Sequence, residues 1–343
     1  MRNRKLFKRI LFLIIFFALA GIVTIWLYFF SPVKVADEGT EIYIGMDAGY
    51  EDVKDSLRLK GILVNERAFD LLSKRKRYIS NIKPGRYVIT DNMSYNDIVN
   101  LLRSGNQSPV WITFNNIRTL ADLSQRLGNQ LAIDSASIHS SLLDESLYND
   151  EGFSRVTIIA AFIPDTYEVY WTIKPDELIS RMIREFRLFW NSERLEKADK
   201  LGLTPVEVII LASIVDDEVL KEEEKPIIAG VYINRLNRDM PLQACPTIKF
   251  ALKDFTLRRI LQEHLKIDSP YNTYIHTGLP PGPVRCASKS GINAVLNAED
   301  HNYLYFVARH DFSGYHHFST NLRDHVNYAN KYHIKLNRLD IYK

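Results

Sequence analysis

The chain has 343 residues, of which 46% are hydrophobic and 25% are charged, with a formal net charge of +3. This length predicts two or three modules, and the composition is ordinary for a globular protein with a sizeable core. The weak net charge gives no indication of a nucleic-acid partner, because much of the basic excess lies in the first nine residues.

The N-terminus is typical of a membrane anchor. A basic tail, residues 1–9, precedes the stretch 10–30, which holds no charged residue. At about 1.5 Å per residue, a helix over this stretch spans roughly 30 Å, the thickness of the hydrocarbon core of a bilayer. The stretch is longer than the apolar part of a signal peptide, and residues 33–36 make a poor cleavage site. We therefore predict a cytoplasmic tail, a single uncleaved transmembrane helix and an extracytoplasmic remainder.

A polar linker, residues 31–40, leads into a small α+β module over 41–108. Its predicted elements are a strand at 41–44, helices at 50–60 and 65–74, a turn and strand at 83–89, and a helix capped by Ser94 that runs to Leu102 and ends at Gly105. This order favours a LysM-like glycan-binding subdomain.

Residues 109–343 are predicted to form a larger, mixed α/β domain. Its expected elements are a strand at 111–114, a mostly helical region at 115–200 with a loop at 162–167 and an amphipathic helix at 175–197, a helix ending near Arg238, an aromatic strand at 303–307 and a closing helix at 325–335. The overall fold class is α+β, with an N-terminal transmembrane helix.

The helix that begins after Thr204 carries the most informative signal. Thr204 to Glu207 form a capping box with proline at the first helical position. At 100° per residue, Glu218 falls within about 20° of Leu211, inside an apolar stripe. A carboxyl group against apolar surface has a raised pKa and can act as a general acid near neutral pH. The alternative is that the helix ends before Glu218, which then faces solvent.

Loops rich in proline, glycine and aromatic residues follow at 241–247, 269–274 and 278–283. Aromatic faces and amides suit sugar rings, although such loops can also be plain turns. The histidines at 301, 310, 316 and 317 have no metal-ligand spacing and are expected to be structural or exposed. We expect no metal and no cofactor.

Several motifs, in order, resemble the YceG-like endolytic transglycosylases, known as MltG. The matching segments are 164–166, 211–218, 231–236, 240–243, 246–247, 271–274, 278–283, 303–307, and His316 with Phe318. The resemblance implies a single-pass inner-membrane enzyme with a LysM-like subdomain and a catalytic domain that faces the cell wall. The family's catalytic glutamate corresponds to Glu218. The first acid of its Glu-Lys-Glu signature corresponds to Asp216 and the lysine to Asp217, whose negative charge is expected to raise the pKa of Glu218 further.

The resemblance also yields candidate substrate-binding residues, namely Gln243, Thr247, Tyr271, Asn272, Tyr274, Gly278, Leu279 and Asn321. Cysteine replaces the usual aspartate at Cys245 and is unusual at Cys286. Both are expected in loops near the cleft, where an extracytoplasmic location permits a disulfide between them; two free buried thiols are the alternative.

The implied activity is cleavage of the β-1,4 bond between N-acetylmuramic acid and N-acetylglucosamine, with formation of 1,6-anhydro ends and termination of nascent strands. Peptidoglycan strands and the inner membrane are the expected partners, with peptidoglycan synthases as further ones. Two alternatives remain open: a non-catalytic wall-binding scaffold for such synthases, and a membrane-anchored hydrolase that leaves reducing ends.

Overall fold

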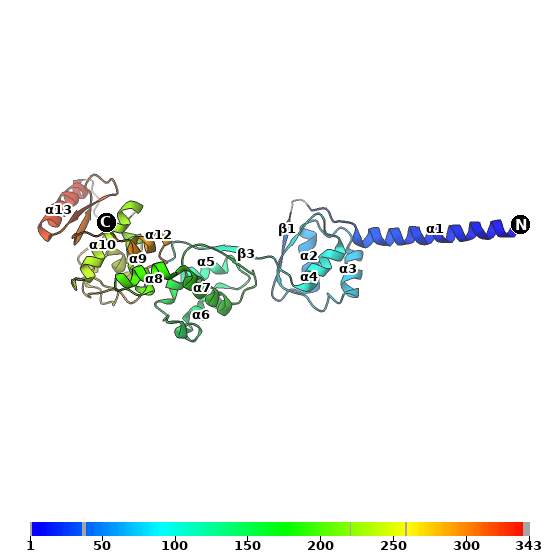
Figure 1. Cartoon of the computed structure of the whole chain (residues 1–343), viewed down its shortest axis with the longest axis horizontal. Coiled ribbons are helices and arrows are strands. Elements are labelled where there is room, and N and C mark those ends of the chain that lie inside the picture. The colour runs from blue at the N-terminus through cyan, green and yellow to red at the C-terminus, as the bar shows by residue number, and fades with distance from the viewer. Residues whose placement is uncertain (1, 36–38, 220, 258, 339–343) are drawn as a thin grey trace. The chain divides into compact units, whose positions relative to one another are not determined.

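The computed structural model describes residues 2–35, 39–219, 221–257 and 259–338 (Figure 1). Residues 36–38 of the predicted linker lie outside this description. Helices and short strands are mixed along the chain, as expected for an α+β protein. The chain forms two compact units. Unit 1 comprises Met1–Ile112, Gln130–Ala132 and Tyr167–Ile173, and unit 2 comprises Thr113–Asn129, Ile133–Thr166 and Lys174–Lys343.

Unit 1 begins with the long helix α1 (Arg2–Phe30). Its segment Phe7–Phe30, 24 residues, is long and apolar enough to cross a membrane, and none of its hydropathic window is buried in the protein. An uncovered apolar surface of this size needs lipid or a partner to leave water.

The rest of unit 1 follows the predicted order of elements. These are β1 (Thr40–Ile44), α2 (Tyr50–Leu59), α3 (Glu66–Arg75), β2 (Gly85–Ile89) and α4 (Tyr95–Ser104). The two strands pair antiparallel, with Thr40 opposite Ile89. Ser94 and Asp97 form a capping box, and Gly105 ends α4 with φ of +73°, which confirms both predicted helix boundaries.

Two side chains show how the helices of unit 1 are joined. Phe69 and Tyr95 pack edge to face at 6.3 Å in its core. The Tyr95 hydroxyl also accepts hydrogen bonds from the backbone N–H groups of Val64 and Asn65. The predicted module boundaries and the LysM likeness remain predictions.

Unit 2 carries most of the helices. They are α5 (Leu120–Gly128), α6 (Ser135–Leu143), α7 (Pro175–Phe189), α8 (Ser192–Lys200), α9 (Pro205–Glu218), α10 (Lys225–Leu236), α11 (Cys245–Leu252), α12 (Lys289–Leu296) and α13 (Leu322–Arg338). The short 3-10 turns are η1 (Glu145–Leu147), η2 (Asn149–Glu151), η3 (Ile158–Ala161), η4 (Glu222–Glu224) and η5 (His264–Lys266). In unit 2, β5 (Tyr305–Ala308) pairs antiparallel with β6 (His316–Ser319). Strand β3 (Val110–Thr113) pairs with β4 (Thr166–Val169), and most residues of these two strands belong to unit 1.

Several predicted elements differ in detail. The helix expected over 175–197 is two helices, because Asn191 caps the start of α8 by accepting a hydrogen bond from the N–H of Arg194. The loop expected at 162–167 passes into β4, and β6 was not predicted. The aromatic strand is displaced to Tyr305–Ala308.

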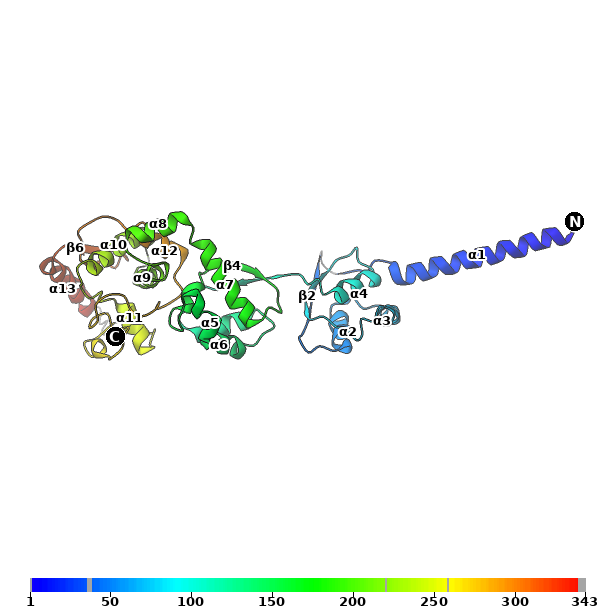
Figure 2. The same ribbon diagram turned by 60° about the horizontal axis from the view of Figure 1, so that its bottom comes forward.

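Helix α9 lies at the centre of unit 2. It contacts α8, α10, α11, α12 and η3, and Figure 2 shows it enclosed by the four helices. Every residue from Val208 to Val215 is buried. The predicted apolar stripe is therefore wrong, because a helix enclosed by neighbours is apolar on all sides.

Candidate active site

Glu218 is the last residue of α9. The Thr204–Glu207 capping box forms as predicted and fixes the start of the helix, fourteen residues in length. The side chain does not point into open solvent, since Oε1 of Glu218 accepts hydrogen bonds from the Tyr232 hydroxyl at 3.3 Å and from the Cys245 N–H at 3.1 Å. These donors come from α10 and from the first residue of α11.

Burial raises the pKa of Glu218 to about 7. The hydrogen bonds from Tyr232 and Cys245 oppose this shift, and the nearby charge of Asp217 adds to it, as expected. The residue as a whole keeps partial solvent access, which a group that meets a substrate requires. A carboxyl with this pKa is half protonated near neutral pH and can both give and take a proton.

Asp217 is not a second free carboxylate. Its two oxygens accept hydrogen bonds from Nη1 and Nη2 of Arg118 at 2.8 and 2.7 Å, and Arg285 adds a third at 3.1 Å. Burial alone would raise the pKa of Asp217, but the bonds and charges of the arginines outweigh it, so the pKa is lowered. Asp217 therefore stays ionised and fully engaged.

Asp216 anchors the same turn of α9 from another side. Its Oδ1 accepts a hydrogen bond from Nζ of Lys225 at 2.8 Å, and the side chains of this pair are only 3% and 6% exposed. The N–H and hydroxyl of Ser288, just before α12, also donate to its carboxylate at 2.6 and 2.8 Å. Gly291 allows this approach, because a Cβ there would lie 2.5 Å from Oδ1 of Asp216. Asp216 and Asp217, the two acids that precede Glu218, thus fix the end of helix α9.

Glu218 lines a pocket of about 540 Å³ in unit 2. Its walls come from the ends of α9 and α10, the 242–249 segment, β5, β6 and α13. The lining residues are Asp217, Glu218, Arg235, Leu242, Gln243, Cys245, Pro246, Lys249, Tyr274, Phe306, Val307, Ala308, His316, His325 and Tyr332. Carboxyl, cationic, amide and aromatic groups meet there.

Arg235 holds two walls of this pocket together. The buried guanidinium donates from Nε to the Leu304 carbonyl at 2.6 Å and from Nη1 to the Leu242 carbonyl at 2.9 Å. Nη1 also reaches Oε1 of Gln243 at 3.3 Å. Gln243 itself is exposed and has φ of +52°, an unusual conformation for a residue with a side chain.

The structure brings only some of the predicted substrate-binding residues to this pocket. Gln243 and Tyr274 line it. Thr247 and Asn272 have no exposed surface and bond within the protein: Thr247 to the Ala244 carbonyl, and Asn272 to the carbonyls of Leu265 and Ile267. The prediction that these two residues contact substrate is therefore wrong, because their side chains hydrogen-bond to the backbone of their own loops instead.

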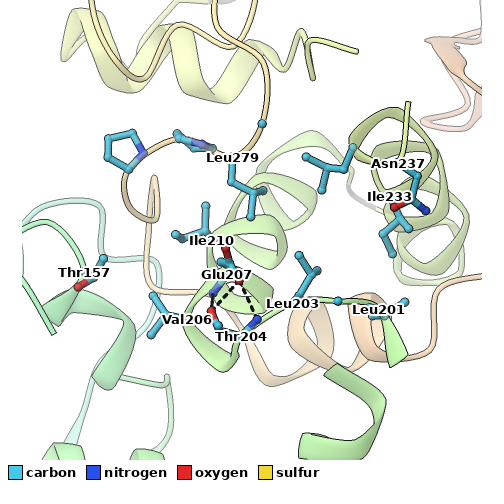
Figure 3. A pocket seen from close by; sticks show the side chains of 15 residues that line it. Thr157, Leu201, Leu203, Thr204, Val206, Glu207, Ile210, Ile233, Asn237 and Leu279 are labelled. Atoms are coloured by element: carbon cyan, nitrogen blue, oxygen red, sulfur yellow. Dashed lines mark hydrogen bonds between the residues drawn. The ribbon is translucent and has the colours of Figure 1, made fainter. Parts of the chain in front are cut away.

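The remaining predicted residues lie elsewhere. Gly278 and Leu279 line a second pocket, of about 550 Å³, beside the start of α9; Figure 3 shows Leu279 over Ile210 there. At about 1.5 Å per residue, the length of α9 places its two ends roughly 20 Å apart. Tyr271 packs its ring on Phe250 at 4.6 Å. Asn321 is exposed and exchanges hydrogen bonds with Asp324 at the start of α13.

The expected disulfide is not formed. Cys245 and Cys286 are both free thiols, and Cys245 begins helix α11 rather than lying in a loop. Its Sγ lies 3.5 Å from the Tyr274 hydroxyl, whereas Cys286 is buried with its Sγ 4.0 Å from the Ile159 carbonyl. The two sulfurs face different neighbours, so the prediction is wrong and the alternative of two free thiols holds.

Sequence reasoning missed several polar residues of the site. Tyr232 and Arg235 lie in a matching motif but were given no role, and Lys249 and His325 carried no signal. His316 was expected to be structural or exposed; it is buried, and it also lines the pocket, which was not predicted. Their common feature is position on α10, α11, β6 and α13, elements that meet only in three dimensions.

Comparison with known proteins agrees with this fold. The model of the YceG-like family matches residues 42–331, and the chain therefore belongs to that family. Two relatives from strains of Streptococcus pneumoniae, each named endolytic murein transglycosylase, are 29% identical over 334 residues, which cover 86% of this chain and 59% of the relative. The chain thus spans about 59% of the length of these relatives.

A Bacillus subtilis protein of the same name is 28% identical over 327 residues, covering 88% of this chain and 87% of its own. Among solved structures, a yceG-like protein from Listeria monocytogenes has a TM-score of 0.56 and 24% identity, over 84% of this chain and 98% of that one. The likeness to this structure concerns the fold.

Proposed function

We propose that the protein is an endolytic peptidoglycan lytic transglycosylase. It would cut the β-1,4 bond between N-acetylmuramic acid and N-acetylglucosamine and leave 1,6-anhydro ends, so that nascent strands are terminated. The observation that carries the proposal is the carboxyl of Glu218, which has a pKa of about 7 in an open pocket. The names of the family relatives support the same activity.

Glu218 acts twice in the proposed reaction. Its protonated form gives a proton to the bridging oxygen as the bond to the anomeric carbon breaks. The substrate's own acetamido or hydroxyl oxygen relieves the positive charge on that carbon. Ionised Glu218 then takes the proton of the C6 hydroxyl, whose oxygen bonds to the anomeric carbon and closes the anhydro ring. The carboxyl returns to its starting form, and water is not consumed.

The state of Asp217 favours this reaction over hydrolysis. Ordinary glycosidases use a second carboxylate as nucleophile or to activate water. Among the described residues that line the pocket, Asp217 is the one other acid, and the arginines occupy both of its oxygens. One available carboxyl suits an intramolecular nucleophile. Gln243 and Tyr274 are proposed to hold the sugars beside Glu218.

The rest of the chain would deliver this site to the cell wall. We propose that α1 is a single anchor in the inner membrane, with the basic tail in the cytoplasm and the chain after α1 outside. The module at 41–108 would hold glycan in the manner of LysM, and synthases would be further partners. A non-catalytic scaffold for those synthases is the competing proposal.

Product analysis on un-crosslinked glycan strands tests the proposed reaction against its two alternatives. The wild type should release anhydro-ended fragments, which are lighter by one water than hydrolysed ones. Glu218→Gln should lower the rate about a hundredfold or more, because general acid catalysis is lost. Products with reducing ends would support the hydrolase, and an inactive but glycan-binding wild type would support the scaffold.

A further inference from the structure

A second polar centre lies in the Glu218 pocket, where Glu224 holds His316. The backbone N–H of His316 donates to Oε1 of Glu224 at 2.9 Å, and its ring Nδ1 lies 2.8 Å from Oε2. The two side chains are only 5% and 10% exposed. Both carboxylate oxygens of Glu224 thus bind His316. These two contacts fix the ring and place a proton on its Nδ1.

Only one nitrogen of this ring is left for another partner. Nε2 of His316 has no hydrogen-bond partner within the described ranges of the chain, and the residue lines the pocket. Phe306 packs edge-on against the ring at 5.5 Å, and Phe318 packs at a tilt, 6.4 Å away. With its faces packed and Nδ1 engaged, the ring presents Nε2 to the pocket.

The same phenylalanine separates this centre from the acid. Phe306 also packs edge-on against Tyr232 at 5.8 Å, and Tyr232 donates to Glu218. One aromatic ring therefore contacts both His316 and the tyrosine that donates to Glu218. A sugar with an apolar ring and polar substituents matches such an arrangement.

Stability alone gives no reason for this pair. A buried polar pair is commonly no more stabilising than apolar residues of the same size, because desolvation offsets the attraction. The two contacts with Glu224 do, however, fix the orientation of the His316 ring, and a substrate-binding group needs a fixed orientation.

We propose that His316 is a substrate-binding residue, whose Nε2 accepts a hydrogen bond from a hydroxyl or acetamido N–H of the sugar in the Glu218 pocket. Glu224 is the positioning residue that fixes the ring. The inference rests on the proposed function for the identity of the ligand, an N-acetylated glycan.

His317 offers a matched control on the same strand. It is the next residue of β6, and consecutive side chains of a strand point to opposite faces. Its ring stacks on Tyr328 at 4.2 Å. It is absent from the pocket lining and has no contact with Glu224 among the described residues.

The test uses the full chain in detergent, with Glu218→Gln present so that glycan is bound but not cut. Affinity for un-crosslinked glycan strands is measured by calorimetry. His316→Phe keeps the aromatic packing and should weaken binding about ten- to a hundredfold, as expected for one hydrogen bond whose partner is left unpaired. His317→Phe should leave binding within about twofold, a change too small for a lost hydrogen bond.

The positioning role has its own measurements. Glu224→Gln keeps the size of the side chain and one of its two acceptor oxygens, so it should weaken binding less than Glu224→Ala, which frees the ring and should weaken binding about tenfold. Added glycan should also shift the ¹⁵N resonance of Nε2 of His316 in the Glu218→Gln protein, which needs no change at His316. Unchanged affinity in folded His316→Phe, or an unmoved resonance with glycan bound, overturns the proposal. A wild type without anhydro products rejects the reaction but leaves these binding comparisons valid.

Discussion

Tyr232 donates a hydrogen bond to Oε1 of Glu218 from a position 14 residues further along the chain. The contact favours the ionised carboxylate, whereas burial, the larger effect, favours the protonated acid. Their balance leaves the pKa at about 7, where one group can serve as acid and then as base.

Activity should therefore fall as the pH rises through about 7. The first step needs protonated Glu218, so kcat/KM should lose about tenfold per pH unit above that value. Rates on un-crosslinked glycan from pH 5 to pH 9 measure the profile. A rate that stays flat to pH 9 would show that another group supplies the proton.

Tyr232→Phe should move this profile to higher pH. Removal of a donor that favours the carboxylate raises the pKa of Glu218 further, and one hydrogen bond corresponds to a displacement of about one pH unit or less. The profile of the variant is compared with that of Tyr303→Phe, whose hydroxyl has no part in the Glu218 contacts. Displacement to lower pH would contradict the assigned role.

Glu218→Gln should stabilise the protein at alkaline pH. Because the folded pKa of about 7 exceeds the ordinary value of 4.5, this carboxyl favours folding below pH 4.5 and loses that contribution as the pH rises through 7. Glutamine does not ionise, so the variant should gain up to about 3 kcal/mol over the wild type at pH 9, relative to pH 4. Denaturant unfolding at pH 4 and pH 9 measures the difference in unfolding free energy between the variant and the wild type. A difference that is the same at both pH values would refute the prediction.

Lys225→Met should destabilise unit 2 by about 3–5 kcal/mol, because it leaves the buried carboxylate of Asp216 without its cation. Lys200→Met removes an exposed partner of Glu196 and should cost less than about 0.5 kcal/mol. Unfolding midpoints of the two variants give the comparison. A small, equal loss in both would mean that Ser288 alone satisfies Asp216.

Gly291→Ala should lower stability by about 1–3 kcal/mol, since its Cβ would meet the Asp216 carboxylate at 2.5 Å and push α12 from α9. Gly45→Ala is the control, because nothing lies within 4 Å of a Cβ at that position. Thermal unfolding and glycan cleavage are measured together. Retention of both by Gly291→Ala would show that α12 yields at little cost.

Local signals were sufficient for much of the fold. The caps at Ser94 and Thr204 were predictable because a capping box involves residues three apart, and it forms at both places. The division of 175–197 into two helices was not predicted, although Asn191 is a good cap, because the apolar spacing continues across it.

The candidate site was predictable only where it coincides with a motif. Glu218 was identified correctly as a buried acid, although the stripe argument that favoured it was wrong for a helix buried on all sides. Helical periodicity predicted that Asp216 and Asp217 point away from the core, yet both form ion pairs there. Two of their partners, Arg118 and Ser288, are distant in sequence and could not be predicted from a local pattern. Burial of Thr247 and Asn272 likewise depends on loop contacts that no local pattern encodes.

The last wall of the Glu218 pocket comes from α13, through His325 and Tyr332, near the C-terminal end of the described chain. Segments that are far apart in the chain, from Glu218 to Tyr332, must therefore come together before this pocket can close. Proteolytic loss of α13 would leave α9 and its acid in place but open one side of the cavity to water. The proposed cleavage would thereby depend on the docking of α13.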